Sequence, residues 1–378
     1  MKRHHRLSVW PNETQLLLLK AATLSLSEAN TAWQLFLTHN ANQLDASGER
    51  LLSLIYFNIA IRLNQSHFLQ SDLLKIKYYA VFSENRFLCN AFSPILSQLL
   101  NAAIPVLTLK GLAYHTLYYK NAGARKMMDI DIMVPPERFV DAALILEKNG
   151  WKTFKCTPLK NFDYKTSCAL TYFDDANNSI DLHYHLLHFA YDKEADDEYW
   201  EAAVPFTWYH QTMLTLSSTD HLLHCCFHGN VVGDYIQPLR WIVDAFYIIA
   251  SREIDWNRFI FLSEKKSLSL FMLNSLRYLK THFNADIPPD VLISLENIKI
   301  TFSDKWFYNG MHRKTNNFFV AQLFQFLVVI RSNNNKSFLY CCCEYLKNIA
   351  STKKLRYVPI KLPLKALHKI KNRMAAIL

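Results

Sequence analysis

The segment DIDIMV, residues 129–134, constrains the fold of this chain more than any other stretch. Side chains alternate along a strand, so its aliphatic residues would enter a core while Asp129 and Asp131 share the opposite face. Two unpaired carboxylates so close together repel one another, and a divalent cation with oxygen ligands relieves that repulsion. We therefore predict a buried strand that carries a metal-binding carboxylate pair. The alternative is a solvated strand end.

A later segment, SIDLHYH at residues 179–185, predicts a second strand with polar residues on one face. Alternation places Asp181, His183 and His185 together on that face. If this strand pairs beside the first, three carboxylates converge, which is enough to hold two metal ions and to accept a proton from an attacking hydroxyl. Each histidine would either contact a substrate or serve as a structural residue, and both roles stay open.

The spacing of apolar residues predicts an α+β protein in which a small mixed β-sheet core is flanked by N-terminal and C-terminal helical regions. Short apolar runs that alternate with helical patterns begin near Ile104 and favour strands connected through helices. We expect a helical region at 1–95, the core at 96–200, a helical domain at 201–350 and a basic tail at 351–378. The chain has only seven glycines, and a glycine-rich nucleotide loop is absent.

The short apolar runs also locate the elements of the core. Strands are predicted at 104–111, 128–134, 151–155, 167–174 and 179–185. Helices are predicted at 112–121 and 136–150, the second with Pro135 and Pro136 at its start and Gly150 as its C-cap.

Two helices of the C-terminal region contain residues of chemical interest. A helix at 219–229 would have Thr219 or Asp220 as its N-cap and would carry His221, His224 and His228. A zinc site is conceivable there, but helix packing or substrate contact is favoured, because no catalytic glutamate accompanies the histidines. In the helix at 238–250, Arg240 and Asp244 share one face, which predicts an internal ion pair.

The positive charge of the chain is concentrated at its end. The formal net charge is +10, but eight lysines or arginines and no acid follow residue 350, so the preceding part carries only +2. That near-neutral body disfavours a nucleic-acid partner. The tail would contact an anionic membrane surface or an acidic partner, or pack on the body as a solvated helix.

The N-terminal residues and the cysteines indicate the cellular compartment of the protein. The N-terminus lacks the sustained apolar region of a secretory signal, and the eight cysteines show no zinc-ribbon or disulfide spacing. We therefore expect a cytoplasmic protein with reduced thiols.

The stretch VLTLKGLAYHTLYYKNAGARKMMDIDIMV at 106–134 and the segment IDLH at 180–183 resemble the uncharacterised nucleotidyltransferase family of the DNA polymerase beta-like superfamily. In that family a Lys-Gly turn precedes a helix, an arginine and an Asp-x-Asp strand, and a later Ile-Asp-Leu-His strand carries a third carboxylate. The matching residues here are Lys110, Gly111, Arg125, Asp129, Asp131 and Asp181. The resemblance spans roughly residues 85–260, because LLHCCFHG, LRWIVDAFYII and IDW look like the helical region that follows the core.

The resemblance implies a nucleotidyltransferase that moves a nucleoside monophosphate from a nucleoside triphosphate to an acceptor hydroxyl or phosphate and releases pyrophosphate. Asp129, Asp131 and Asp181 would bind Mg²⁺, with Mn²⁺ as an alternative, and Asp181 would also activate the acceptor. The resemblance suggests a peptide or a sugar as the acceptor.

Four further residues are expected at the nucleotide. Gly111 would let the backbone turn tightly so that the amides of the next helix face phosphate, and Lys110 would add a positive charge. Arg125 would hold a phosphate or form a structural ion pair, and His183 would contact the nucleotide. The better-known polymerase beta-like enzymes have a Gly-Ser turn just before the aspartates. This chain has Lys110-Gly111 further upstream, which leaves open the groups that grip the phosphates.

Two other functions are compatible with parts of this pattern. A metal-dependent glycosyltransferase also uses Asp-x-Asp at a strand end to hold a sugar nucleotide, but it needs neither the upstream Lys-Gly nor a third aspartate. A non-catalytic binding protein could keep the same fold, although a scaffold has no use for three clustered acids.

Overall fold

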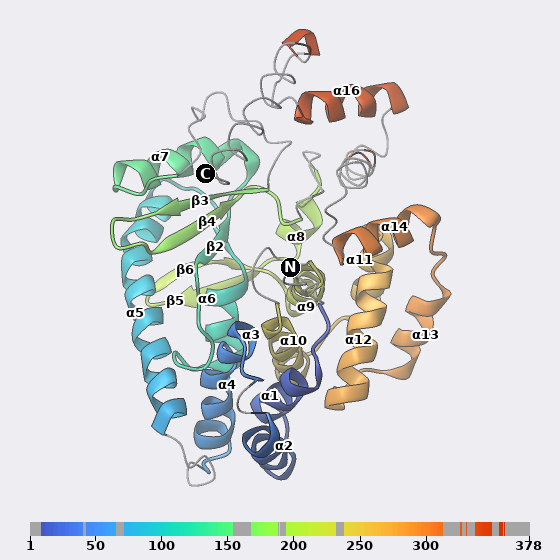
Figure 1. Cartoon of the computed structure of the whole chain (residues 1–378). Helices are drawn as coiled ribbons and strands as arrows, with labels where there is room; N and C mark the ends of the chain where they lie inside the picture. The colour runs from blue at the N-terminus through green and yellow to red at the C-terminus, as the bar shows by residue number, and fades with distance from the viewer. Residues whose placement is uncertain are drawn as a thin grey trace, which may run out of the picture.

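The computed structural model of the chain describes residues 9–40, 43–65, 72–153, 168–187, 189, 194–231, 238–312, 326, 330, 337–349, 355–357 and 359. Helices occupy most of this part of the chain, and one mixed β-sheet lies among them (Figure 1). The predicted α+β class is therefore confirmed. The predicted basic tail lies outside the described residues except for 355–357 and 359, and the predicted strand at 151–155 is described only as far as 153.

The helices fall into three groups along the chain. The N-terminal group comprises α1 (Glu13–Thr23), α2 (Leu26–His39), α3 (Ala46–Glu49), α4 (Leu52–Tyr56), the π-helical η2 (Phe57–Arg62) and α5 (Asp72–Asn101). Between the strands lie α6 (Lys110–Tyr114), the π-helical η4 (His115–Tyr119), η5 (Pro136–Arg138), α7 (Phe139–Lys148) and α8 (Asp197–Glu201). The C-terminal group comprises α9 (Ser218–Gly229), α10 (Arg240–Ser251), α11 (Trp256–Lys265), α12 (Ser269–Phe283), α13 (Pro289–Asn297), α14 (Phe302–Met311), α16 (Phe338–Ile349) and η7 (Leu355–Tyr357).

The described strands form one six-stranded sheet in the order β3-β4-β2-β1-β6-β5. Their bounds are β1 (Leu107–Thr108), β2 (Ile130–Met133), β3 (Ala169–Phe173), β4 (Ser179–His183), β5 (Val204–Trp208) and β6 (Gln211–Thr215). The β2–β4 and β1–β6 pairs are parallel, and the other pairs are antiparallel. Four of the predicted strands are thus present. Within residues 151–153, the fifth is reduced to an isolated bridge from Lys152 to Phe173.

The two faces of the sheet pack against different cores. On one face, Ile130, Ile132, Ile180 and Leu182 join a buried cluster with residues of α5 and α7. Met133 belongs instead to a larger cluster formed mainly by the N-terminal and C-terminal helices. The prediction that the aliphatic residues of 129–134 enter a core is confirmed. Alternation then places Asp131 on the face that looks toward the helical regions.

A β-hairpin lies where we predicted a return to helices after residue 200. β5 and β6 pair with each other, and β6 extends the sheet beside β1. Phe206, Trp208 and Met213 are buried, whereas Thr207 and Thr212, which alternate with them along the strands, are exposed, so the hairpin buries one side. The helical prediction is wrong for this segment, because two five-residue runs, one interrupted by Pro205, carry too few periods to be distinguished from a loop.

Helix ends agree with the sequence at one site and differ at another. Gly150 follows α7 with a φ of +84°, a left-handed conformation that glycine adopts without steric cost, as predicted for the C-cap region. α9 begins earlier than predicted, because the side chain of Ser217 accepts the amide hydrogen bond of Asp220 and is the N-cap.

The length and apolarity of the helices also bear on membrane insertion. Among the described residues, no helix is both long and apolar enough to cross a bilayer.

The contact between α9 and α10 generates the first prediction. A Cβ atom added at Gly229 would lie 2.0 Å from Cγ of Trp241, so the two helices approach too closely for any side chain there. We expect Gly229→Ala to lower the free energy of unfolding by about 1–3 kcal/mol in urea denaturation, because the overpacked helices must separate. Gly150→Asn is the control, since its Cβ meets nothing within 4 Å and asparagine tolerates positive φ. Equal stability of Gly229→Ala and wild type would contradict the close approach.

Candidate active site

The register of β2 and β4 brings the predicted acidic residues together. Asp131 pairs with Asp181 across the parallel strands, so both side chains lie at the same level of the sheet and on the same face. Ligand atoms of Asp131, Asp181 and His183 all lie within 4.8 Å of one another. The predicted pairing of these two strands is therefore confirmed, and Asp129 lies at the entrance of β2 beside this group.

Two cationic side chains hold Asp131. The carboxylate is buried, and its Oδ1 accepts from Lys110 Nζ at 2.7 Å and contacts His183 Nε2 at 3.2 Å. Burial would raise the pKa of Asp131, but Lys110 and His183 together hold it well below its usual range. Asp131 is consequently ionised and already paired within the folded chain.

His183 and Lys110 are charged for the same reason. Burial alone would lower the pKa of His183, but its hydrogen bond to Asp131 raises the pKa to about 9. Burial likewise opposes the charge of Lys110, and the surrounding aspartates outweigh it and raise the lysine pKa. At neutral pH the two cations therefore neutralise part of the acidic face.

The other two carboxylates are less well compensated. Burial and the charge of Asp131 raise the pKa of Asp129 well above its usual range, against the opposing effect of Lys110. Oδ1 of Asp181 is buried and has no hydrogen-bond partner in the described part of the chain. A buried acceptor without a partner costs about 1–3 kcal/mol, so the acidic face is electrostatically unsatisfied.

The donor set fits a divalent cation. The oxygens of Asp129, Asp131 and Asp181 are the hard ligands that Mg²⁺ and Mn²⁺ prefer, whereas His183 in the same group is protonated and therefore acts as a hydrogen-bond donor and not as a ligand. A cation there would give the unpartnered oxygen of Asp181 a counter-charge and would relieve the repulsion that raises the pKa of Asp129.

The backbone at Lys110 is strained. This residue joins β1 to α6 with a φ of +32°, a region that non-glycine residues rarely occupy and that costs about 1–3 kcal/mol. Such strain persists only where the surroundings enforce it, and here the amide of Leu109 donates to the carbonyl of Asp131 while Lys110 Nζ bonds the same residue's carboxylate. The turn therefore aims the ammonium group at the acidic face.

Gly111 has a different role from the one we predicted. The unusual φ belongs to Lys110, and Gly111 is not among the described residues with positive φ. A Cβ at Gly111 would instead approach Met127 Cγ to 3.2 Å and Arg125 Nη1 to 3.6 Å. The glycine thus allows the chain that enters β2 to pass close beneath the turn.

Arg125 has the geometry of a structural ion pair. It is buried, its Nε donates to Oδ1 of Asp244 at 2.7 Å, and its guanidinium lies over the ring of Tyr114 at 5.6 Å. Tyr119 Oη donates to the same carboxylate oxygen at 2.8 Å. Of the two roles left open by the sequence, these contacts support the structural one.

The predicted ion pair between Arg240 and Asp244 is therefore wrong, because each of these residues binds another partner. Asp244 binds Arg125 from the loop before β2, while Nη1 of Arg240 donates to the backbone carbonyl of Lys126. Both residues of α10 thus hold that loop instead of each other, because helical spacing says which residues share a face but not what the face meets.

Helices from the N-terminal region fix the same loop. Asn85 of α5 donates to the carbonyls of Ala122 and Arg125 at 2.8 and 2.9 Å, and accepts from the amide of Met127 at 2.8 Å. Ser53 of α4 donates to the carbonyl of Ala124 at 3.0 Å. The loop that precedes Asp129 and Asp131 is consequently hydrogen-bonded to helices of both the N-terminal and the C-terminal groups.

The remaining histidines have separate environments. His185 lies beyond β4, where its Nδ1 pairs with Asp196 at 2.7 Å. His221 lies in the core between Tyr118 Oη at 2.8 Å and Thr215 Oγ1 at 3.2 Å, and burial lowers its pKa to about 3. His221, His224 and His228 form no converging metal group within the part of the chain that is described.

His224 was not singled out by the sequence as a neighbour of the acidic face. It is buried, its Nδ1 has no hydrogen-bond partner among the described residues, and burial followed by the charges of Lys110 and His228 lowers its pKa. No sequence signal separates it from the other histidines of α9, because only the packing of the helix shows which one faces the sheet.

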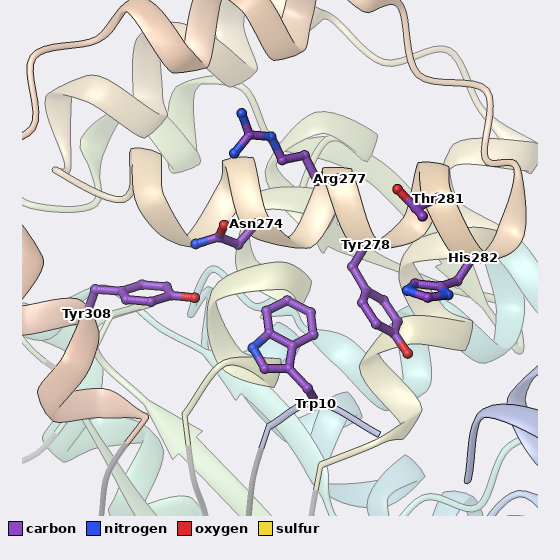
Figure 2. A pocket seen from close by; sticks show the side chains of 7 residues that line it. All are labelled: Trp10, Asn274, Arg277, Tyr278, Thr281, His282 and Tyr308. Atoms are coloured by element: carbon purple, nitrogen blue, oxygen red, sulfur yellow. The ribbon is translucent and has the colours of Figure 1, made fainter. Parts of the chain in front are cut away.

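A separate pocket lies in the C-terminal helical region. Its volume is about 290 Å³, and Figure 2 shows the side chains around it. The lining residues are Trp10, Asn274, Arg277, Tyr278, Thr281, His282 and Tyr308. The aromatic rings of Trp10 and Tyr278 pack at 4.9 Å between centroids, and none of the acidic residues described above contributes to this pocket.

Comparison with known families agrees with the arrangement of the acidic face. A family model described as "Uncharacterised nucleotidyltransferase" matches residues 46–284, which is more than half of the chain. The matched region extends on both sides of the motifs, from the start of α3 to the end of α12. No curated protein sequence matches the chain.

The raised pKa of Asp129 predicts a pH-dependent effect on stability. A carboxyl group whose pKa is higher in the folded than in the unfolded state loses stabilisation as the pH rises above the unfolded value of about 4. Without metal, Asp129→Asn should therefore match wild type near pH 4 and exceed it by about 1–3 kcal/mol near pH 8, measured by urea unfolding in chelator. Asp175→Asn, at an exposed turn, is the control. A stability difference that does not change with pH would contradict the buried acidic pair.

The ion pair of Arg125 predicts a large cost when its cation is removed. We expect Arg125→Gln to destabilise the protein by about 3–5 kcal/mol in urea unfolding, because Asp244 stays buried without its cation. Asp244→Asn in the same background should recover part of that loss, as a double-mutant cycle would measure. Wild-type stability of Arg125→Gln would return this residue to the list of nucleotide contacts.

Proposed function

We propose that this chain, which belongs to the uncharacterised nucleotidyltransferase family, transfers a nucleoside monophosphate from a nucleoside triphosphate to an acceptor hydroxyl or phosphate. The observation that carries the proposal is the convergence of Asp131, Asp181 and His183 across β2 and β4, with Asp129 beside them and one buried oxygen of Asp181 unpartnered. The family match and this unsatisfied acidic face support the same chemistry.

The carboxylates would hold the divalent cation. Asp131 and Asp181 face each other, and Asp129 would join them once its proton is lost. When bound, Mg²⁺ or Mn²⁺ supplies stabilisation of the charge that develops on the attacking and leaving oxygens. Oδ1 of Asp181 has no hydrogen-bond partner among the described residues, so this carboxylate would accept the proton of the acceptor hydroxyl.

Lys110 and His183 would exchange partners as substrate binds. In the folded chain they neutralise Asp131, and a cation that takes over this carboxylate would free their N–H groups for phosphate oxygens. Both are held in place beforehand, Lys110 by its turn and His183 by its position on β4. Such preorganised donors cost no reorganisation during the reaction. Arg125 would act through the loop before β2 and not on the nucleotide.

The acceptor is proposed only as a class. A peptide or a sugar hydroxyl fits the resemblance of the sequence motifs, and none of the described residues selects between them. The proposal is tested against two alternative functions. One is a glycosyltransferase that uses a sugar nucleotide, and the other is a non-catalytic binding protein.

The test is thermal unfolding of the purified protein with each nucleoside triphosphate, with and without Mg²⁺. We expect a stabilisation that requires both triphosphate and metal, about 2.7 kcal/mol at a hundredfold excess over the dissociation constant. Asp181→Asn should lose it while keeping wild-type stability without ligand, because the oxygen of interest makes no protein hydrogen bond. Asp131→Asn is a less clean variant, since it also removes the partner of Lys110 and His183.

Turnover gives the second readout. Asp129→Asn and Asp131→Asn should abolish metal-dependent pyrophosphate release, whereas Asp175→Asn at an exposed turn should not. Stabilisation by a sugar nucleotide alone would favour the glycosyltransferase, and no stabilisation by any nucleotide would favour the binding protein.

A further inference from the structure

Two arginines from distant parts of the chain flank Asp129. Arg50 lies between α3 and α4, and Arg240 is the first residue of α10. The charge of Asp129 acts on both guanidinium groups, and the two arginines act on each other. Hydrogen bonds place both beside the loop that precedes Asp129, because Arg240 donates to the carbonyl of Lys126 and Ser53, three residues after Arg50, donates to the carbonyl of Ala124. The two arginines are 190 positions apart in the sequence.

Arg50 has no anionic partner of its own. Its side chain is half-buried, yet it makes no hydrogen bond or ion pair with any residue in the described ranges. The segment that carries it is fixed, because Ser53 one turn later is bonded to the carbonyl of Ala124. Its five N–H donors are therefore not engaged by the described part of the chain and are available to an anion.

Arg240 stands where a helix disfavours a cation. The N-terminus of a helix carries partial positive charge from its unpaired amides, so a positive side chain in the first turn of α10 is destabilised. Burial, together with the charges of Arg125 and Arg50, lowers the pKa of Arg240 to about 10. Its guanidinium donates from Nη1 to the carbonyl of Lys126, and this hydrogen bond leaves its other N–H groups available among the described residues.

The local charges do not balance once a metal is bound. Asp244 is occupied by Arg125 and Tyr119, and the nearest remaining carboxylate is Asp129. A divalent cation at the acidic face would claim Asp129 and leave Arg50 and Arg240 without a counter-charge. A polyanion that reaches from the carboxylates to both arginines would restore the balance of charge.

We infer that Arg50 and Arg240 bind the β- and γ-phosphates of the donor triphosphate, so that the helical regions on both sides of the sheet complete the nucleotide site. The inference rests on the proposed nucleotidyl transfer and names the groups that grip the phosphates. Arginine suits this task, because its planar fork binds phosphate oxygens in pairs and stays charged when partly buried. The family match from residue 46 to residue 284 includes both arginines.

The test compares ligands that differ only in their phosphates. Binding of a non-hydrolysable nucleoside triphosphate, the matching monophosphate and inorganic pyrophosphate would be measured by calorimetry with Mg²⁺. We expect Arg50→Gln and Arg240→Gln each to weaken triphosphate and pyrophosphate binding by roughly 10–100-fold, and monophosphate binding by less than about threefold. Arg50→Lys should recover part of the loss, since it restores charge without the fork.

Arg252→Gln is the matched control, because this exposed arginine lies at the opposite end of the same helix. Arg50→Gln loses no hydrogen bond to a described residue, so its unfolding temperature without ligand should equal that of wild type. That keeps the test valid even if Arg240→Gln fails to fold.

The outcomes separate this inference from the proposed function. Wild-type binding of triphosphate that is unchanged in Arg50→Gln would overturn the phosphate clamp and leave nucleotidyl transfer standing. A wild-type protein that binds pyrophosphate through both arginines but binds no triphosphate would support the anion site and overturn the proposed function. A wild-type protein that binds neither ligand would overturn both.

Discussion

The parallel pairing of β2 with β4 is the contact on which the rest of the structure depends. It sets Asp131 beside Asp181 and extends the acidic face to His183. A slip of one residue would turn these side chains into the apolar core, so the register is enforced by the aliphatic residues on the other face. Ile130, Ile132, Ile180 and Leu182 therefore position the site although none of them faces it.

The same face shows how the folded chain accommodates several buried charges. Lys110 and His183 neutralise Asp131, and the strained backbone at Lys110 is tolerated because the ion pair and the β1–β2 contact hold it. The compensation is incomplete, since Asp129 has a raised pKa and Asp181 keeps a buried oxygen without a partner. This incomplete compensation is compatible with the binding of a divalent cation at the acidic face.

The loop that leads into β2 connects the site to both helical regions. Asn85 and Ser53 hold it from the N-terminal side, and Asp244 and Arg240 hold it from α10. Through these bonds, helices that are far from the carboxylates in the sequence form one structural unit with the acidic face. The family match, which begins before α4 and ends after α12, covers this whole unit and not the sheet alone.

Local patterns in the sequence determined the α+β class, four of the strands, the helix that ends near Gly150 and the two acidic segments, because alternation and capping depend on near neighbours. The hairpin of β5 and β6 was not predicted, since its short runs become strands by pairing with each other and with β1. The partners of Arg125 and Arg240, the strain at Lys110 and the place of Arg50 were likewise decided by the tertiary structure. Spacing along a chain specifies which side chains share a face, whereas the charge that meets that face comes from other segments, 21 and 52 residues away for Asp131 and 119 residues away for Asp244.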